Sequence, residues 1–293
     1  MTANSTIEEP PKRFGLESQV KRNPHPDFKK VENSRPPFDD DLNWKYTQIP
    51  NKDWKIGSGA NDPTWSEHKK ITIDPYGENR NPVDNYKLLI GAITPRPIGF
   101  LSTISKDGVT NLAPFSFFNL VNHDPPIFAI GFSCNKANPK DSLRNILETE
   151  EVVINIISEW FIEAANFCST NSPFGIDEFK LSGLTPLPSE KVKPPHVGES
   201  AFSIEAKLYK IEEFQSKAVP GKASGTLVLV EGINFHVRDD VVNDQLNIVD
   251  IAKLKPVSRL GGITFGRTIS GYEALRPDYE KDVVNNDAAK EFL

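Results

Sequence analysis

Apolar and polar residues alternate along the middle of the chain in the pattern of a β-hairpin. Residues 98–104 follow the two-residue period of a strand, which places Ser102 and Thr103 on opposite faces. A polar turn ending at Gly108 follows, and glycine adopts the positive φ that tight turns need. The returning strand contains Pro114. Because proline cannot donate to a strand ladder, we expect a sheet edge, a bulge or a bend there.

Other hydrophobic runs predict more strands than helices. Further strands are expected at residues 125–133, 151–157, 200–214 and 224–237. Residues 169–199 hold many Gly, Pro and Ser residues and are expected to form a long loop. Strands and helices do not alternate regularly, and no G-x-G-x-x-G motif is present. The predicted fold class is therefore mainly β, a barrel with peripheral helices.

Three helices are expected around these strands. The first covers residues 84–93 with Asp84 as its N-cap. Its expected apolar face consists of Tyr86, Leu89, Ile90 and Ile93. The second begins at Asn138, because asparagine is a good N-cap and Pro139 suits the first helical position. Ser158 is the expected cap of the third.

Composition divides the chain into four segments. Residues 1–43 are poor in apolar side chains and are predicted to be a disordered N-terminal tail. Residues 44–77 form a glycine-rich arm with three of the four tryptophans. Aromatic side chains this dense are expected to pack on the barrel or on a partner subunit, and a free recognition arm is the alternative. Residues 78–275 form the barrel domain, and residues 276–293 are a charged C-terminal tail.

Charge and cysteine usage narrow the class of protein. The formal net charge of −6 and the scattered Lys and Arg residues argue against nucleic acid as a partner. Cys134 and Cys168 have neither disulfide nor metal-ligand spacing. No apolar run reaches the length of a membrane span, and the first residues lack the apolar core of a signal peptide. We therefore expect a cytoplasmic protein that binds no metal and no membrane.

Two places offer ligand-binding chemistry. The helix expected from Asn138 presents N–H groups and a positive dipole end, with Lys140 and Ser142 in its first turn, so it suits a phosphate. Backbone N–H groups released near Pro114 suit a phosphate- and amide-rich cofactor such as flavin mononucleotide (FMN). The alternative at both places is ordinary surface or strand structure. His236 ends an apolar strand and is expected to be structural.

Four sequence blocks in a fixed order carry a family resemblance. They read TPRPIGFLST at 94–103, a DG turn, NLAPFSFFN at 111–119 and DPP at 124–126. Further matching stretches are residues 138–157, residues 192–208 and RLGG at 259–262. With these blocks the chain resembles the flavin reductase-like, FMN-binding split-barrel family over roughly residues 71–275. The N-terminal quarter lies outside the resemblance.

The resemblance implies a function and a set of cofactor-binding residues. It implies an FMN-binding split β-barrel, a homodimer, and hydride transfer from NADH or NADPH to FMN and on to a small acceptor such as flavin, oxygen or a quinone. It implies no catalytic side chain, since the flavin carries the chemistry. The implied cofactor-binding residues are Arg96, Ser102, Thr103, Asn111, Leu112, Ala113, Ser116, Lys140, Ser142 and Arg259. Many relatives have a tyrosine shortly after RLGG, where this chain has Phe265.

Other functions are compatible with the same blocks. A non-catalytic FMN-binding or redox-sensing protein is the main alternative. Other split barrels bind haem or pyridoxal phosphate, which is a weaker alternative.

Overall fold

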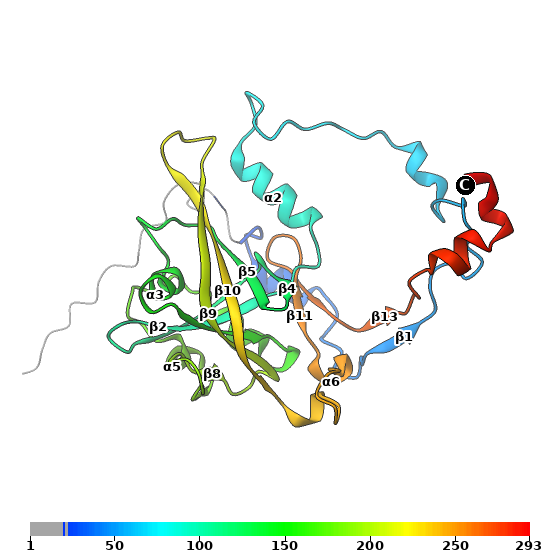
Figure 1. The fold of residues 1–293 in the computed structure, drawn as a ribbon. Helices are drawn as coiled ribbons and strands as arrows, with labels where there is room; N and C mark the ends of the chain where they lie inside the picture. The colour runs from blue at the N-terminus through cyan, green and yellow to red at the C-terminus, as the bar shows by residue number, and fades with distance from the viewer. Residues whose placement is uncertain (1–19, 21–22) are drawn as a thin grey trace, which may run out of the picture. The chain divides into compact units, whose positions relative to one another are not determined.

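The computed structural model describes residue 20 and residues 23–293, which divide into two compact units (Figure 1). One unit contains the described residues up to Phe38 together with Pro75–Thr268, and the other contains Asp39–Asp74 and Ile269–Leu293. The predictions made for residues 1–19 and 21–22, disorder and the absence of a signal core, lie outside the described residues. Among the helices that are described, none is both long and apolar enough to cross a bilayer.

The larger unit is built on one antiparallel sheet of seven strands, in the order β3-β2-β6-β9-β10-β5-β4. The strands are β2 (Gly99–Ile104), β3 (Thr110–Phe115), β4 (Phe118–His123), β5 (Pro126–Phe132), β6 (Glu151–Ile156), β9 (Phe202–Gln215) and β10 (Ala223–Val237). The two edge strands, β3 and β4, are joined by only Ser116 and Phe117. Such a short link brings opposite edges of the sheet together, so the sheet has to curl into a barrel. The Gly131 N–H of β5 donates to the oxygen of Phe117, one of the two linking residues, at 2.7 Å.

Short elements surround the barrel. They are α1 (Phe28–Asn33), α2 (Pro82–Ala92), α3 (Asp141–Thr149), η3 (Glu159–Phe161), α4 (Ile162–Phe167), α5 (Glu178–Ser182), β7 (Pro186–Leu187), β8 (His196–Val197), η4 (Asp239–Val241), α6 (Ile251–Leu254), β11 (Val257–Arg259) and β12 (Phe265–Arg267). The mainly β fold class expected from the strand pattern is confirmed. The hairpin turn is also confirmed, with Gly108 at φ +84°.

The two faces of β2 contribute to two different hydrophobic cores. Leu101 packs with side chains of β5, β9 and β10 and with Leu143 and Ile146 of α3. Phe100, on the other face, packs with Phe161 and with elements of the 157–197 region. Both faces of the strand are therefore buried, and a hydroxyl placed there by Ser102 or Thr103 needs a partner inside the protein.

Two predicted helix starts are wrong by a few residues. Helix α2 begins at Pro82 with Asn81 as N-cap, and the Asn81 side chain accepts from the Val83 N–H at 2.9 Å, so Asp84 is not the cap. The Asn81-Pro82 pair matches the usual sequence of cap and first helical residue better than Asp84 does. Of the expected apolar face of α2, Ile90 is buried, whereas Tyr86, Leu89 and Ile93 are exposed.

Helix α3 begins at Asp141, with Lys140 in the N-cap position and no side-chain capping bond. Asn138 instead takes part in a tight turn, in which its N–H donates to the Asn135 side chain at 2.9 Å. Leu143 and Ile146 of this helix are fully buried and form part of a hydrophobic core.

The region between Ser158 and residue 199 holds more structure than the sequence predicted. Ser158 occupies the cap position of η3, but its buried hydroxyl has no hydrogen-bond partner among the described residues. The long loop expected at 169–199 contains α5 and the short strands β7 and β8. Helix α5 has five residues, too few for a hydrophobic period to stand out in the sequence.

The segments predicted as tails and arm also contain regular structure. Helix α1 lies in the predicted tail and is capped by Asp27, whose side chain accepts from the Lys30 N–H at 3.1 Å. The smaller unit contains β1 (Lys45–Thr47), η2 (Pro63–Glu67), β13 (Ser270–Tyr272), a π-helical turn η5 (Glu280–Val284) and η6 (Asp287–Phe292). Strands β1 and β13 pair in parallel, and the Trp44 ring lies directly on Gly271, where a side chain would not fit. Packing of the 44–77 arm on the barrel or on a partner stays a prediction.

A buried carboxylate on β9 organises the loop before β8. Glu205 is fully buried, and its Oε1 accepts from Asn234 Nδ2 at 3.0 Å and contacts His236 Nε2 at 2.5 Å. Backbone N–H groups of residues 190–192 donate to the same carboxylate at 2.5–3.0 Å. Burial alone would raise the pKa of Glu205, but these hydrogen bonds outweigh it and lower the pKa to about 2. His236 is therefore bound to a structural carboxylate, as its place at the strand end predicted.

Glu205→Gln should destabilise the barrel strongly, because the amide places a donor against groups that already donate. We expect a loss of about 3 kcal/mol or more in the free energy of unfolding at pH 7, measured by urea titration. Glu212→Gln, an exposed position on the same strand, is the matched control and should change it by less than about 0.5 kcal/mol. Equal effects of the two substitutions would contradict this role for Glu205.

Candidate functional site

Three of the predicted cofactor-binding residues meet where α3 crosses β2 and β3. Asn111 of β3 donates from Nδ2 to the Thr103 hydroxyl at 3.1 Å and to the Ser142 hydroxyl at 2.9 Å. Asn145 of α3 donates to the same Thr103 oxygen at 3.1 Å. All four side chains are buried. We call Thr103, Asn111, Ser142 and Asn145 the polar cluster.

The register of the hairpin and the period of the helix explain this arrangement. Thr103 and Asn111 are directly opposite each other in the β2–β3 pairing. Ser142 and Asn145 are three residues apart in α3 and so share one helix face. Both Nδ2 hydrogens of Asn111 are used within the protein, which leaves its Oδ1 as the group that a ligand could reach. The Asn145 Oδ1 is buried and has no partner among the described residues.

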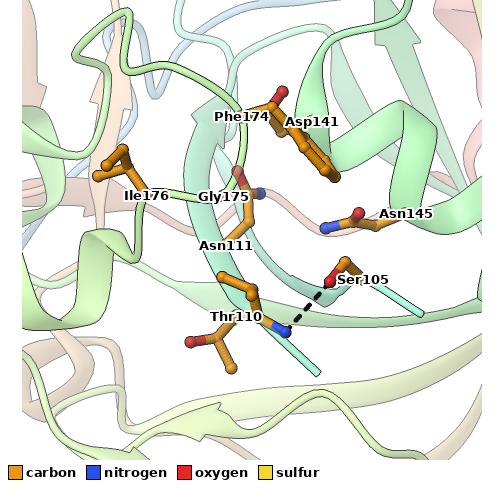
Figure 2. Close-up of a pocket in the computed structure, with 9 residues that line it drawn as sticks. Ser105, Thr110, Asn111, Asp141, Asn145, Phe174, Gly175 and Ile176 are labelled. Atoms are coloured by element: carbon orange, nitrogen blue, oxygen red, sulfur yellow. Dashed lines mark hydrogen bonds between the residues drawn. The ribbon is translucent and has the colours of Figure 1, made fainter. Parts of the chain in front are cut away.

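A small recess lies beside the polar cluster (Figure 2). Its walls come from the end of the hairpin, from Asp141 and Asn145 on α3, and from the loop at Phe174–Ile176. The Ser105 hydroxyl accepts from the Val109 N–H at 3.1 Å and fixes the hairpin end at one side. The recess has a volume of about 10 Å³, room for about one water molecule, so it can receive only one small group of a larger ligand.

Strand β3 is a sheet edge, which is one of the three possibilities expected at Pro114, and a carboxylate covers its outward side. The outward N–H of Leu112 donates to Glu178 Oε2 of α5 at 3.2 Å. Hydrogen-bonding directions alternate along a strand, so Pro114 is the next outward position and its missing N–H interrupts no ladder bond. Glu178 thus satisfies the edge donor next to the proline and shields the edge from other strands.

Two carboxyl groups near the polar cluster hold protons more tightly than usual. Burial raises the pKa of Glu178 to about 7, although the Leu112 N–H acts in the opposite direction, and the Asp141 charge raises it further. Burial also raises the pKa of Asp141, against the attraction of Arg144. Asn145 and Glu178 were not predicted from the sequence. The i, i+3 spacing from Ser142 could have indicated Asn145, but no local signal pairs Glu178 with Leu112.

Arg96 and Arg259 lie side by side but face protein groups. Their backbones form an antiparallel bridge with N–H···O distances of 3.0 and 2.9 Å. The Arg96 guanidinium donates to the Ile90, Ile93 and Leu260 oxygens at 2.5, 2.7 and 3.0 Å, and only its buried Nε has no partner among the described residues. Arg259 donates to the Gly262 oxygen at 2.8 Å and lies 4.3 Å over the Phe265 ring. Burial lowers the pKa of both arginines.

The remaining predicted residues are spread around the same end of the sheet. Ser102 lies on the face of β2 away from Thr103, as its strand position predicted, and its buried hydroxyl has no partner within the described chain. Ala113 within β3 and Ser116 just after its end are both half-buried. Lys140 is half-buried at the N-cap of α3, where its N–H donates to the Cys134 sulfur at 3.3 Å. The structure therefore joins Thr103, Asn111 and Ser142 directly and places Arg96 and Arg259 as a separate pair.

No group of three or more His, Cys, Asp or Glu side chains within the described residues is arranged to hold a metal ion. Cys134 and Cys168 form no disulfide. Burial raises the pKa of the Cys168 thiol to about 11, which keeps it protonated at neutral pH.

The comparisons with known proteins define the class of protein. The flavin reductase like domain matches residues 91–251, more than half of the chain, so the chain belongs to the flavin reductase-like family. An uncharacterized protein of Aquifex aeolicus is 41% identical over 178 residues, which cover 60% of this chain and 86% of that protein. YwrF of Bacillus subtilis is 32% identical over 194 residues, 66% of this chain and 94% of YwrF.

Solved structures show the same fold. Nitrilotriacetate monooxygenase component B from Bacillus cereus is 30% identical, with a TM-score of 0.66 over 71% of this chain and 100% of that one. The 2-nitrobenzoate 2-nitroreductase NbaA of Pseudomonas fluorescens is 28% identical, with a TM-score of 0.61 over 72% of this chain and 98% of that one. Flavoredoxin of Desulfovibrio vulgaris is 25% identical, with a TM-score of 0.51 over 64% of this chain and 92% of that one. The split barrel expected from the resemblance is confirmed.

Glu178→Gln should change how stability depends on pH. A raised pKa in the folded state means that the unfolded chain loses this proton first, so wild-type stability falls as pH rises from about 4.5 to about 7. The glutamine variant lacks this loss and still offers an oxygen to Leu112. We expect its free energy of unfolding relative to wild type to rise across that window by on the order of 2–3 kcal/mol, measured by urea titration at several pH values.

Glu163→Gln, an exposed position on α4, is the control and should leave the pH profile unchanged. Parallel profiles for wild type and Glu178→Gln would show that the buried carboxyl group titrates normally and would contradict this description of the sheet edge.

Proposed function

We propose that the chain is an FMN-binding oxidoreductase of the flavin reductase type, which uses NADH or NADPH as hydride donor. When bound, FMN would accept the hydride and pass electrons on to a small acceptor such as flavin, oxygen or a quinone. The observation that carries the proposal is the polar cluster. Side chains from three family-like blocks of the sequence, Thr103, Asn111 and Ser142, are hydrogen-bonded to one another in the barrel unit.

The residues present carry the charged and hydrogen-bonding groups that could bind a flavin. The N–H groups of the first turn of α3 have no acceptor within the helix, and Lys140 and Ser142 adjoin them, which suits a phosphate. The Asn111 Oδ1 and the backbone from Ala113 to Ser116 would meet the amide edge of the ring system. The buried, unpartnered Asn145 Oδ1 beside the recess is a further group that a ligand donor would satisfy.

The role of the protein in this chemistry is to bind, orient and exclude water. The two hydrophobic cores on either side of β2 fix the strand, and the polar cluster fixes α3 against it. Groups held in this way need little reorganisation when a ligand binds. A flavin-binding protein without turnover, for redox sensing, is the alternative and requires the same binding groups. Steady-state consumption of NADH or NADPH with flavin, oxygen or a quinone separates the two, and no consumption with any acceptor overturns the enzyme.

A homodimer and a cytoplasmic location are part of the proposal. The exposed apolar face of α2 supports a partner, since Leu88, Leu89 and Ile93 are 47%, 54% and 60% exposed in the single chain. Two-fold dimers are the commonest closed assemblies. The absence of a disulfide between the two cysteines agrees with a reducing compartment.

Lys140→Ala should weaken the binding of FMN but not of riboflavin, which lacks the phosphate. Loss of one charge-assisted contact, about 1.5–3 kcal/mol, corresponds to at least a tenfold rise in the FMN dissociation constant, measured by flavin fluorescence quenching. Lys210→Ala, an exposed lysine on β9, is the control and should bind both ligands as wild type does. Equal weakening for FMN and riboflavin would place the Lys140 ammonium away from the phosphate.

A further inference from the structure

A second hollow of the barrel unit is lined by none of the predicted cofactor-binding residues. It has a volume of about 410 Å³, within the range of small-molecule sites. One wall consists of Pro24, His25, Phe28 and Arg35, in and around α1. The other consists of residues 261–265, the turn that joins β11 to β12. The N-terminal quarter of the chain, which the family resemblance leaves unexplained, therefore contributes half of a cavity.

The turn offers backbone donors to an anion. The Leu260 N–H donates to the Thr264 oxygen at 3.0 Å, and the Thr264 N–H donates to the Gly261 oxygen at 3.2 Å. The N–H groups of the three residues between them on the chain, 261–263, donate to no group in the described structure. Gly262 adopts φ +59°, and successive N–H groups in such a turn form an anion-binding nest.

The facing wall offers cationic and aromatic side chains. The exposed Arg35 guanidinium forms no ion pair with any described residue, and the same holds for the His25 ring. Phe28 and Phe265 add two aromatic rings to the lining. In a chain of net charge −6, the Arg35 cation and the free N–H groups around one hollow favour a negatively charged ligand with an aromatic group.

The turn is held in place from behind by the two arginines of the Arg96–Arg259 bridge. Arg96 donates to the Leu260 oxygen at 3.0 Å, and Arg259 donates to the Gly262 oxygen at 2.8 Å. Gly261 lies against Gly91 of α2, so closely that a Cβ on Gly261 would be 3.2 Å from the Gly91 Cα. A pinned turn loses little freedom when a ligand binds, which favours binding.

We propose that this hollow binds the adenosine-phosphate end of the pyridine-nucleotide donor, with Arg35, His25 and the 261–263 N–H groups on the phosphates and the phenylalanine rings on adenine. The choice of donor rests on the proposed function. The predicted FMN contacts in the polar cluster, on β3 and on α3 do not line the hollow, whereas Arg96 and Arg259 adjoin it by holding the 260–262 turn. The N-terminal segment would thus select the hydride donor rather than bind the flavin.

Calorimetric titration of the full-length protein with ADP tests the site without turnover. We expect ADP to bind, and Arg35→Ala to raise its dissociation constant at least tenfold, with Arg35→Lys between the two. Lys30→Ala, on the same helix but outside the hollow, is the matched control and should bind ADP as wild type does. Unchanged melting temperatures show that the variants fold. No ADP binding, or equal binding by wild type and Arg35→Ala, overturns the inference.

Two further readouts separate this inference from the proposed function. In steady-state assays, Arg35→Ala should raise KM for NADH or NADPH about tenfold and leave kcat and the FMN content unchanged. If Arg35→Ala lowers FMN content and leaves KM for the donor unchanged, the hollow holds the flavin and the inference is wrong. A chain that takes up no FMN contradicts the proposed function, whereas Arg35-dependent ADP binding by that same chain would still support the nucleotide site.

Discussion

The two-residue link between β3 and β4 is the constraint on which the larger unit depends. Strands at opposite edges of a seven-stranded sheet are joined by Ser116 and Phe117 alone, so the sheet closes into a barrel. Closure leaves β3 with one paired side, toward β2, and one outward side. The segment that carries Asn111 and Pro114 is therefore held as part of a closed sheet and still borders a surface that a ligand can approach.

Polar groups at this edge explain how a strand next to an open site avoids unsatisfied donors. Pro114 removes one outward N–H, and Glu178 accepts the outward N–H of Leu112. The inward side chain of Asn111 joins Thr103 and Ser142, which ties α3 to the hairpin. The same helix start would supply phosphate-binding N–H groups. One set of hydrogen bonds thus fixes both the edge of the barrel and the groups proposed to meet the flavin.

Much of the fold could be predicted from the sequence, because its signals are local. The 98–116 hairpin, the turn at Gly108 and the edge at Pro114 follow from strand period, glycine φ and the missing proline donor. The five-residue helix α5 was missed because it is too short for the 3.6-residue hydrophobic period to repeat. The cap of α2 was misplaced because Asp84 and Asn81 are both good caps, and the adjoining Pro82 marks the true start.

The candidate site was less predictable, because its contacts join distant parts of the chain. Glu178 and Leu112 are 66 residues apart, and nothing near either one indicates the other. The wall around Arg35 lies in a segment predicted to be disordered, where low hydrophobicity hid the short helix α1. Arg96 was expected at a cofactor, and the structure shows its guanidinium on three carbonyl oxygens of the protein. Charge and residue type indicated which side chains could bind a ligand, but not whether the fold would turn them toward a ligand or toward other protein groups.

The central claim is that this barrel holds FMN and that a pyridine nucleotide reduces it. An anaerobic titration of the purified full-length protein with NADH and with NADPH, followed by absorbance, tests both parts at once. The account predicts a flavin spectrum in the purified protein and loss of its long-wavelength band on addition of at least one nucleotide. A colourless protein that takes up no added FMN, or bound flavin that neither nucleotide bleaches, would contradict it.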